Sequence, residues 1–201
     1  MVDESSNGGM TAAGVLLTGG RSRRMGTAKA ALRRGGDSMA QRTAVLLAGA
    51  TNPTVEVGPG YTRLHPIVED EPGAGPLAAV AAGTIGLRRL GWFGAAIVVA
   101  TDLPLLSSRL LTWLAGYPSD RAIVPVYAGR PQPLCARYPG RDLDRAVALV
   151  RDGKRSMRDL LDEIDPRLIP PDQWVPVAGR ADALFDVDTP DDLETIGWTR
   201  P

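Results

Sequence analysis

The segment from Gly14 to Lys29 combines glycines and basic side chains in an order that suits the binding of a polyphosphate. An apolar run at 14–17 is typical of a buried strand. Paired glycines follow at 19–20, and glycine lets the backbone turn sharply and approach a ligand closely. The positive charges that come next are Arg21, Arg23, Arg24 and Lys29. Because backbone N–H groups, arginine and lysine all donate to phosphate oxygens, the segment predicts a phosphate-binding loop.

Two familiar phosphate loops do not fit this segment. A Walker A loop needs a glycine, four further residues and then Gly-Lys-Ser/Thr, whereas Gly26 is followed by Thr-Ala-Lys. The dinucleotide pattern G-x-G-x-x-G is excluded because Gly19 and Gly20 are adjacent.

The order of residues 17–29, Leu-Thr-Gly-Gly-Arg-Ser-Arg-Arg-Met-Gly-Thr-Ala-Lys, instead resembles the signature loop of nucleotidyltransferases. It is most similar to that of the molybdenum cofactor guanylyltransferase (MobA) family. The resemblance implies a catalytic role for Lys29, which would neutralise charge on the transferring phosphoryl group, and Arg24 is a second catalytic candidate. Ala28 departs from the family, which usually carries Asp or Asn there. The nucleotide-binding candidates in this loop are Leu17, Thr18, Gly19, Gly20, Arg23 and Lys29.

Asp102 follows the most apolar run of the chain, 95–100. Magnesium prefers one or two carboxylates together with phosphate oxygens, so a carboxylate at the end of a buried strand beside phosphates is a suitable ligand. The resemblance likewise implies that Asp102 binds the metal, Mg²⁺, and contacts the nucleotide. A turn or helix-capping aspartate is the structural alternative.

Later segments extend the resemblance. Glu69-Asp70 followed by Gly75-Pro76-Leu77-Ala78 is similar to the family's E-D…G-P-L-A segment, which implies that Asp70 contacts the nucleotide. Residues 153–161 resemble a G-x-R-S-x-R-x-L-L helix start that favours the guanylyl over the cytidylyl relatives. Residues 185–190 resemble N-V-N-T-P with aspartates in place of both asparagines. The resemblance implies that Asp186 or Asp188 is a second metal ligand or contacts the pterin, and helix capping by Asp188 or Thr189 is the structural alternative. The pterin-binding candidates are Gly75, Pro76, Arg155, Asp186 and Asp188.

Strand-like and helix-like runs alternate along the chain, which predicts helices on both faces of a sheet. The fold class expected is α/β, a Rossmann-like three-layer nucleotidyltransferase fold with a mostly parallel central sheet. Residues 1–12 are expected to form a flexible tail and 13–201 a single domain. The predicted strands are 14–17, 54–57, 65–68, 95–100, 122–126, 134–138 and 185–187. The predicted helices are 38–49, with Val45, Leu46 and Leu47 facing inward, and 77–90, 107–115, 141–150, 156–164 and 189–194.

Composition excludes several classes of function. The formal net charge is zero, which gives no support for nucleic-acid binding. One cysteine, Cys135, permits no internal disulfide or zinc cluster, and one histidine permits no multi-histidine site. The sequence has no apolar run of the length that spans a membrane, and its polar N-terminus is unlike a signal peptide. A cytoplasmic protein is expected, with Cys135 in the core.

The resemblance implies transfer of GMP from GTP to molybdenum-loaded molybdopterin, which yields the guanine dinucleotide form and pyrophosphate. The partners implied are GTP, molybdopterin and a molybdoenzyme or its chaperone, without nucleic acid or membrane. A cytidylyltransferase on the same pterin, or another nucleotidyltransferase on a phosphorylated acceptor, is the nearest alternative. A non-catalytic nucleotide or cofactor carrier for a molybdoenzyme is the alternative from another class.

Overall fold

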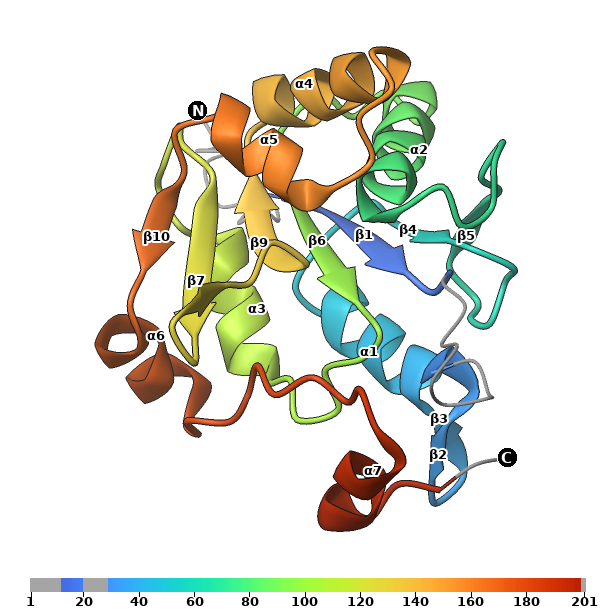
Figure 1. Cartoon of the computed structure of the whole chain (residues 1–201), viewed down its shortest axis with the longest axis vertical. Helices are drawn as coiled ribbons and strands as arrows, with labels where there is room; N and C mark the ends of the chain where they lie inside the picture. The colour runs from blue at the N-terminus through green and yellow to red at the C-terminus, as the bar shows by residue number, and fades with distance from the viewer. Residues whose placement is uncertain (1–11, 20–28, 200–201) are drawn as a thin grey trace, which may run out of the picture.

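A mixed, mostly parallel sheet forms the centre of the protein (Figure 1), whose computed structural model describes residues 12–19 and 29–199. Its strand order is β10-β7-β9-β6-β1-β4-β5, and β8 pairs with β7. The strands are β1 (Ala13–Leu17), β4 (Thr54–Val57), β5 (His65–Ile67), β6 (Ala96–Ala100), β7 (Ile123–Tyr127), β8 (Arg130–Pro131), β9 (Cys135–Tyr138) and β10 (Arg167–Ile169). A separate hairpin pairs β2 (Arg33–Arg34) with β3 (Asp37–Ser38).

Helices cover both faces of this sheet, which confirms the three-layer expectation. The helices are α1 (Met39–Ala48), α2 (Pro76–Arg89), α3 (Ser108–Ala115), α4 (Gly140–Arg151), α5 (Met157–Glu163), α6 (Pro171–Ala178), α7 (Pro190–Ile196) and the 3₁₀ turn η1 (Lys29–Ala31). One face packs against α2, α4 and α5, and the other against α1, α3 and α6 (Figure 1). No helix among the described residues is both long and apolar enough to cross a membrane.

The alternation of a strand explains this two-sided core. In β1, Leu16 packs with α1 and α3, whereas Val15 and Leu17 pack toward α2 on the opposite face. Successive side chains of a strand point to opposite faces, so a central strand covered on both sides must be apolar throughout. All five residues of β1, and all five of β6, are buried accordingly.

Most predicted elements are confirmed within about two residues, and three details are wrong. Residues 185–187 form no strand, although Val187 is buried. Val45 is 73% exposed because Ala44 and Leu47 define the inward stripe of α1, and Val45 lies about 100° from Ala44 around the helix. Ala12, assigned to the tail, is fully buried and its carbonyl accepts from the Asn52 N–H at 3.1 Å.

Cys135 is fully buried in β9, as expected for a core residue. Burial raises the pKa of its thiol to about 12, so the side chain is a neutral apolar filler at physiological pH. A role in thiol chemistry is therefore not supported by its surroundings.

Candidate functional site

The neighbouring strands β6, β1, β4 and β5 are all parallel, so their carboxyl ends lie along one edge of the sheet. Their last residues stand in register across the sheet: Ala100, Leu17, Val57 and Ile67. In open α/β sheets, ligands bind beyond the carboxyl ends of the strands. The residues that follow these four strands therefore form the candidate site.

Beyond β6 and β1, an ion-pair cluster joins three segments that are far apart in the sequence. The Lys29 ammonium lies 3.3 Å from Asp102 Oδ2 and 2.7 Å from Asp188 Oδ1. Lys29 begins η1, Asp102 follows β6, and Asp188 precedes α7. The side chains of Lys29 and Asp102 remain 18% and 31% exposed, so both can be reached by a ligand.

The C-terminal segment reaches this cluster through one backbone contact and one small apolar cluster. The Val187 N–H donates to the Asp102 carbonyl at 3.0 Å, which places Asp186 and Asp188 on either side of that contact. The apolar cluster that buries Val187 consists of Leu32, Met39, Val187, Leu193 and Trp198. This packing explains why Phe185 and Val187 are apolar although residues 185–187 form no strand.

Charges and burial shift the acid–base behaviour of this cluster. Burial raises the pKa of Asp102, Lys29 opposes this rise, and the neighbouring charge of Asp186 adds to it, so the net shift is upward. Burial lowers the pKa of Lys29, but the hydrogen bond and charge of Asp188, together with those of Asp102, outweigh it and raise the pKa. Lys29 is thus a permanent cation held between two carboxylates.

Beyond β1, the chain leaves the sheet through a tight backbone contact with β4. The N–H groups of Thr18 and Gly19 both donate to the Val57 carbonyl, at 2.9 and 3.3 Å. Gly58 has a φ of +145°, and a methyl group there would clash with the Thr18 hydroxyl. A methyl group on Gly19 would lie 2.8 Å from a carboxylate oxygen of Glu69. Glycine is therefore required at Gly58 for the two segments to pack this closely, whereas a larger residue at position 19 would displace the Glu69 side chain.

Glu69, rather than the predicted Asp70, lies against this turn. Asp70 is exposed and makes no hydrogen bond or ion pair with any described residue. Burial raises the pKa of the Glu69 carboxyl. Sequence pattern alone offers little reason to separate the two acids, because they are adjacent and both follow the short strand β5. The role of Asp70 as a nucleotide contact stays a prediction.

The predicted pterin residues fall into two groups. Gly75 and Pro76 begin α2 and lie against the backbone of Arg155, where a methyl group on Gly75 would come within 2.7 Å of the Arg155 carbonyl. Asp186 and Asp188 lie instead with Asp102. Because α2 follows β5 in the chain, its N-terminus belongs to the same edge of the sheet as the ion-pair cluster.

The Arg155 guanidinium is turned toward its own segment. It donates to the carbonyls of Val150 and Lys154 at 2.8 and 2.9 Å, and its other terminal nitrogen lies 3.9 Å from Glu71. Gly20, Arg23 and Arg24, which were predicted to bind or act on the nucleotide, lie outside the described residues.

Leu17 and Thr18 have buried side chains, at 6% and 3% exposure. A contact between either residue and a nucleotide would therefore involve the backbone. The Thr18 hydroxyl donates at 2.7 Å to Glu56, a fully buried carboxylate that the sequence analysis did not select. The only signal for Glu56 was an acid within the otherwise apolar strand 54–57.

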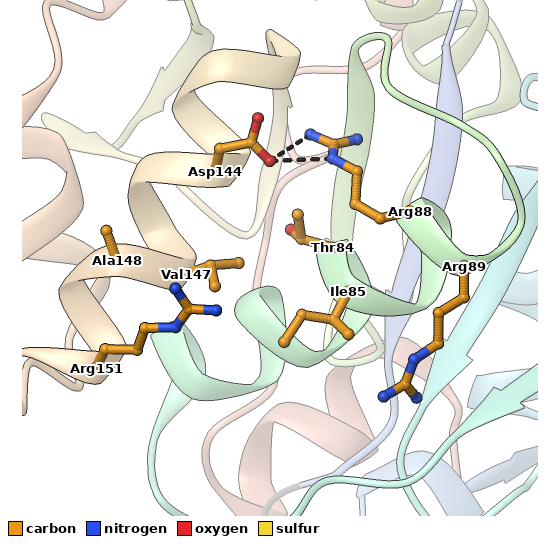
Figure 2. Close-up of a pocket in the computed structure, with 8 residues that line it drawn as sticks. All are labelled: Thr84, Ile85, Arg88, Arg89, Asp144, Val147, Ala148 and Arg151. Atoms are coloured by element: carbon orange, nitrogen blue, oxygen red, sulfur yellow. Dashed lines mark hydrogen bonds and ion pairs between the residues drawn. The ribbon is translucent and has the colours of Figure 1, made fainter.

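The groove in Figure 2, of about 480 Å³, lies between α2 and α4 and contains none of the predicted site residues. The guanidinium of Arg88 forms an ion pair with Asp144 at 2.8 Å beside it. The groove is formed by the C-terminal half of α2, whereas the edge of the sheet described above adjoins its N-terminus. The candidate site is therefore defined by Lys29, Asp102 and the β1 exit.

A metal at this edge would need ligands beyond the side chains that the structure describes. Within 12–19 and 29–199, no three carboxylate, thiol or imidazole side chains are grouped so that they could hold an ion. Magnesium commonly keeps only one or two carboxylates and takes phosphate oxygens and waters for the rest. Asp102, whose carboxylate is near a second acid, Asp186, fits that requirement.

Comparison with solved structures defines the fold as that of a nucleotidyltransferase. Molybdopterin-guanine dinucleotide biosynthesis protein A from Archaeoglobus fulgidus matches with a TM-score of 0.73 at 24% identity, over 91% of this chain and 95% of that one. The 2-C-methyl-D-erythritol 4-phosphate cytidylyltransferase from Thermus thermophilus matches with a TM-score of 0.60 at 18% identity, over 92% and 96%.

The model of the MobA-like NTP transferase domain matches residues 14–168, and the chain belongs to this family. A similar curated protein is a "probable molybdenum cofactor guanylyltransferase" from Bacillus cereus strain Q1. It is 29% identical over 189 residues, which cover 88% of this chain and 91% of the relative. The family resemblance and the fold class inferred from the sequence are thus confirmed.

Proposed function

We propose that this protein transfers GMP from GTP to molybdenum-loaded molybdopterin, forming the guanine dinucleotide cofactor and pyrophosphate. The observation that carries the proposal is the Lys29–Asp102–Asp188 cluster at the carboxyl edge of a parallel sheet in a MobA-like chain. The name of the Bacillus cereus relative and the guanylyl-type segment 153–161 support guanine as the base.

The proposed reaction is an in-line substitution at the α-phosphorus of GTP. An oxygen of the pterin's terminal phosphate forms a bond to that phosphorus, and the bond to the oxygen bridging the α- and β-phosphates breaks. Pyrophosphate leaves with that bridging oxygen. The attacking phosphate is already anionic, so no nucleophilic side chain is required. Orienting the two substrates supplies much of the acceleration.

Lys29 would stabilise the negative charge that grows on the departing pyrophosphate. In the structure its ammonium is held by two carboxylates, one of which, Asp188, is 56% exposed. A polyphosphate entering this edge offers the lysine stronger anionic partners than an exposed carboxylate. Lys29 can therefore exchange a protein partner for a ligand partner without being left unpaired.

Magnesium is the proposed cofactor, with Asp102 as its protein ligand. Bound there, Mg²⁺ would neutralise charge on the phosphate oxygens during the transfer. With Mg²⁺ bound, Asp102 would contact the metal, and its ion pair with the Lys29 ammonium would weaken. Asp186 or Asp188 is the candidate for a second metal contact or for the pterin, and Gly75, Pro76 and Arg155 form the remaining pterin candidates. The cytoplasm is the location expected for this reaction.

Pyrophosphate release tests the proposal. The full-length protein is mixed with molybdenum-loaded molybdopterin and Mg²⁺, and with GTP, CTP, ATP or UTP in turn. Release with GTP, well above that with the other three, is expected. Release with CTP alone would favour the cytidylyl alternative, and nucleotide binding without release would favour the carrier alternative.

A further inference from the structure

Glu56 lies beside the β1 exit and is an ionised side chain that the proposed chemistry does not use. It lies in β4, is fully buried, and its two carboxylate oxygens accept four hydrogen bonds. Oε1 accepts from the Thr18 hydroxyl and the Tyr61 N–H, both at 2.7 Å. Oε2 accepts from the Thr62 N–H at 2.9 Å and from the Thr62 hydroxyl at 2.6 Å.

The four donors hold Glu56 in its charged form. Burial alone raises the pKa of a carboxyl, but the bonds from Thr62, Thr18 and the two backbone N–H groups outweigh it and hold the pKa of Glu56 below its ordinary value. No lysine or arginine among the described residues forms an ion pair with it. A buried charge is costly unless it is fully hydrogen-bonded, so all four donors must be aimed at this one group.

These donors come from two separate segments at the carboxyl edge of the sheet. Thr18 is the first residue after β1 and begins the chain's path into the glycine-rich basic loop. Tyr61 and Thr62 belong to the turn between β4 and β5, whose first residue, Gly58, packs against Thr18. One carboxylate therefore sets both the position of the β1 exit and the position of the turn beside it.

We infer that Glu56 is a positioning residue for nucleotide binding: it fixes the backbone of Thr18 and Gly19 in the geometry that the nucleotide requires. This inference rests on the proposed function for the identity of the ligand. A neutral isostere cannot replace Glu56, because an amide nitrogen cannot accept from an N–H or hydroxyl donor. Loss of a donor should loosen the β1 exit and weaken binding of the nucleotide, while Lys29 and Asp102, on other segments, keep their chemistry.

The test pairs a disruptive and a conservative change at the same residue. Thr62→Val removes the hydroxyl that donates to Glu56 and accepts from the Leu64 N–H at 3.1 Å, and Thr62→Ser retains both bonds. Calorimetric titration with Mg-GTP should show about fivefold weaker binding for Thr62→Val and wild-type binding for Thr62→Ser. Glu56→Gln should weaken binding further. In steady-state assays the KM for GTP should rise while kcat changes less than about twofold, with the KM for the pterin unaltered.

Circular dichroism and thermal melts establish that each variant is folded, and Glu163→Gln, on the outer surface of α5, controls for loss of a glutamate elsewhere. Should Glu56→Gln fail to fold, the Thr62 pair decides the matter. A folded Thr62→Val that binds Mg-GTP as wild type does would overturn the inference. So would a fall in kcat with an unchanged KM. If wild type binds Mg-CTP instead, the proposed function fails, and the same titrations with Mg-CTP still test the role of Glu56.

Discussion

Two clusters of interacting residues, one around Asp102 and one around Glu56, lie at the same edge of the sheet and differ in the groups that donate to their carboxylates. Asp102 and Asp188 share the ammonium of Lys29, and all three side chains are partly exposed. Glu56 is fully buried and, among the described residues, is satisfied by hydroxyl and backbone donors alone. The first cluster can exchange its partners for a phosphate or a cation, whereas the second cannot change partners without leaving a buried group unpaired.

The residues around Lys29 are therefore suited to binding a ligand, whereas those around Glu56 are suited to holding the local backbone in place. The ion pairs of Lys29 are partly exposed, so a ligand can replace a protein partner there at smaller cost to the fold than at a fully buried group. A buried, fully hydrogen-bonded carboxylate specifies one local geometry. Substitutions in the two clusters should therefore divide into those that change the rate and those that change nucleotide affinity and stability.

The largest effect is expected from Asp102→Asn. The amide lacks the charge that would hold Mg²⁺ and keeps nearly the same volume, so turnover should fall by about 10²–10³-fold with the melting temperature nearly unchanged. Pyrophosphate release at saturating Mg²⁺ measures it, with Asp172→Asn on α6 as the matched control. Activity within about threefold of wild type would remove Asp102 from the catalytic machinery.

Lys29→Ala should lower the rate constant by about 100-fold, with a much smaller effect on pterin affinity. The charge that Lys29 stabilises is greater in the transition state than in the ground state, so the rate should fall more than the pterin affinity, even though Lys29 also contacts the pterin candidate Asp188 at 2.7 Å. Single-turnover rates and pterin titrations on one preparation separate the two effects. An unchanged rate constant with lost pterin affinity would place Lys29 in the pterin subsite instead.

Glu56→Gln should lower the free energy of unfolding by about 2 kcal/mol near neutral pH, because one donor loses its acceptor in the interior. The folded-state pKa of Glu56 is lowered, so its contribution is present above the ordinary glutamate pKa, about 4.3, and is lost as pH falls through the folded value. Wild type should therefore approach the stability of the variant in acid. Urea denaturation from neutral to acidic pH measures this, and a gap that does not narrow would contradict it.

The smallest effect is expected in the pH dependence of Asp186→Asn. Asp102 must be ionised to act, and its raised pKa means that activity is lost at a higher pH than for an ordinary aspartate. Because Asp186 contributes to that rise, its neutralisation should move the acidic limb of kcat/KM to lower pH. Asp182→Asn is the control, and an unmoved limb would show that Asp186 does not influence Asp102.

Local sequence patterns predicted the central strands because each must be apolar on both faces, and they predicted most helices because several carry a start signal. Ser38, for example, caps α1 through a capping box with Gln41. The patterns missed β10, α6 and the two-residue strands β2, β3 and β8. β10 has three residues between Pro166 and Pro170 and is held as a strand by its pairing with β7, and α6 carries prolines at 171 and 176.

The candidate site was predictable where a residue directly follows a strand, as Asp102 does. The site was less predictable where the position of a residue depends on contacts with distant parts of the chain. The contact of Asp188 with Lys29 spans 159 residues and depends on the burial of Val187, which no local pattern specifies. Glu56 was missed because an acid in a strand carries no sign of the donors that will surround it, and these come from Thr18 and the turn after β4.

Transfer of label from GTP to molybdopterin tests the central claim most directly. GTP labelled at its α-phosphate and GTP labelled at its γ-phosphate are supplied in parallel with Mg²⁺ and molybdenum-loaded molybdopterin, and the pterin product is isolated. The account predicts that the α-label enters the pterin and the γ-label leaves in pyrophosphate, and that Asp102→Asn nearly abolishes both outcomes. Transfer of the γ-label, or binding of GTP with no transfer of either label, would contradict it.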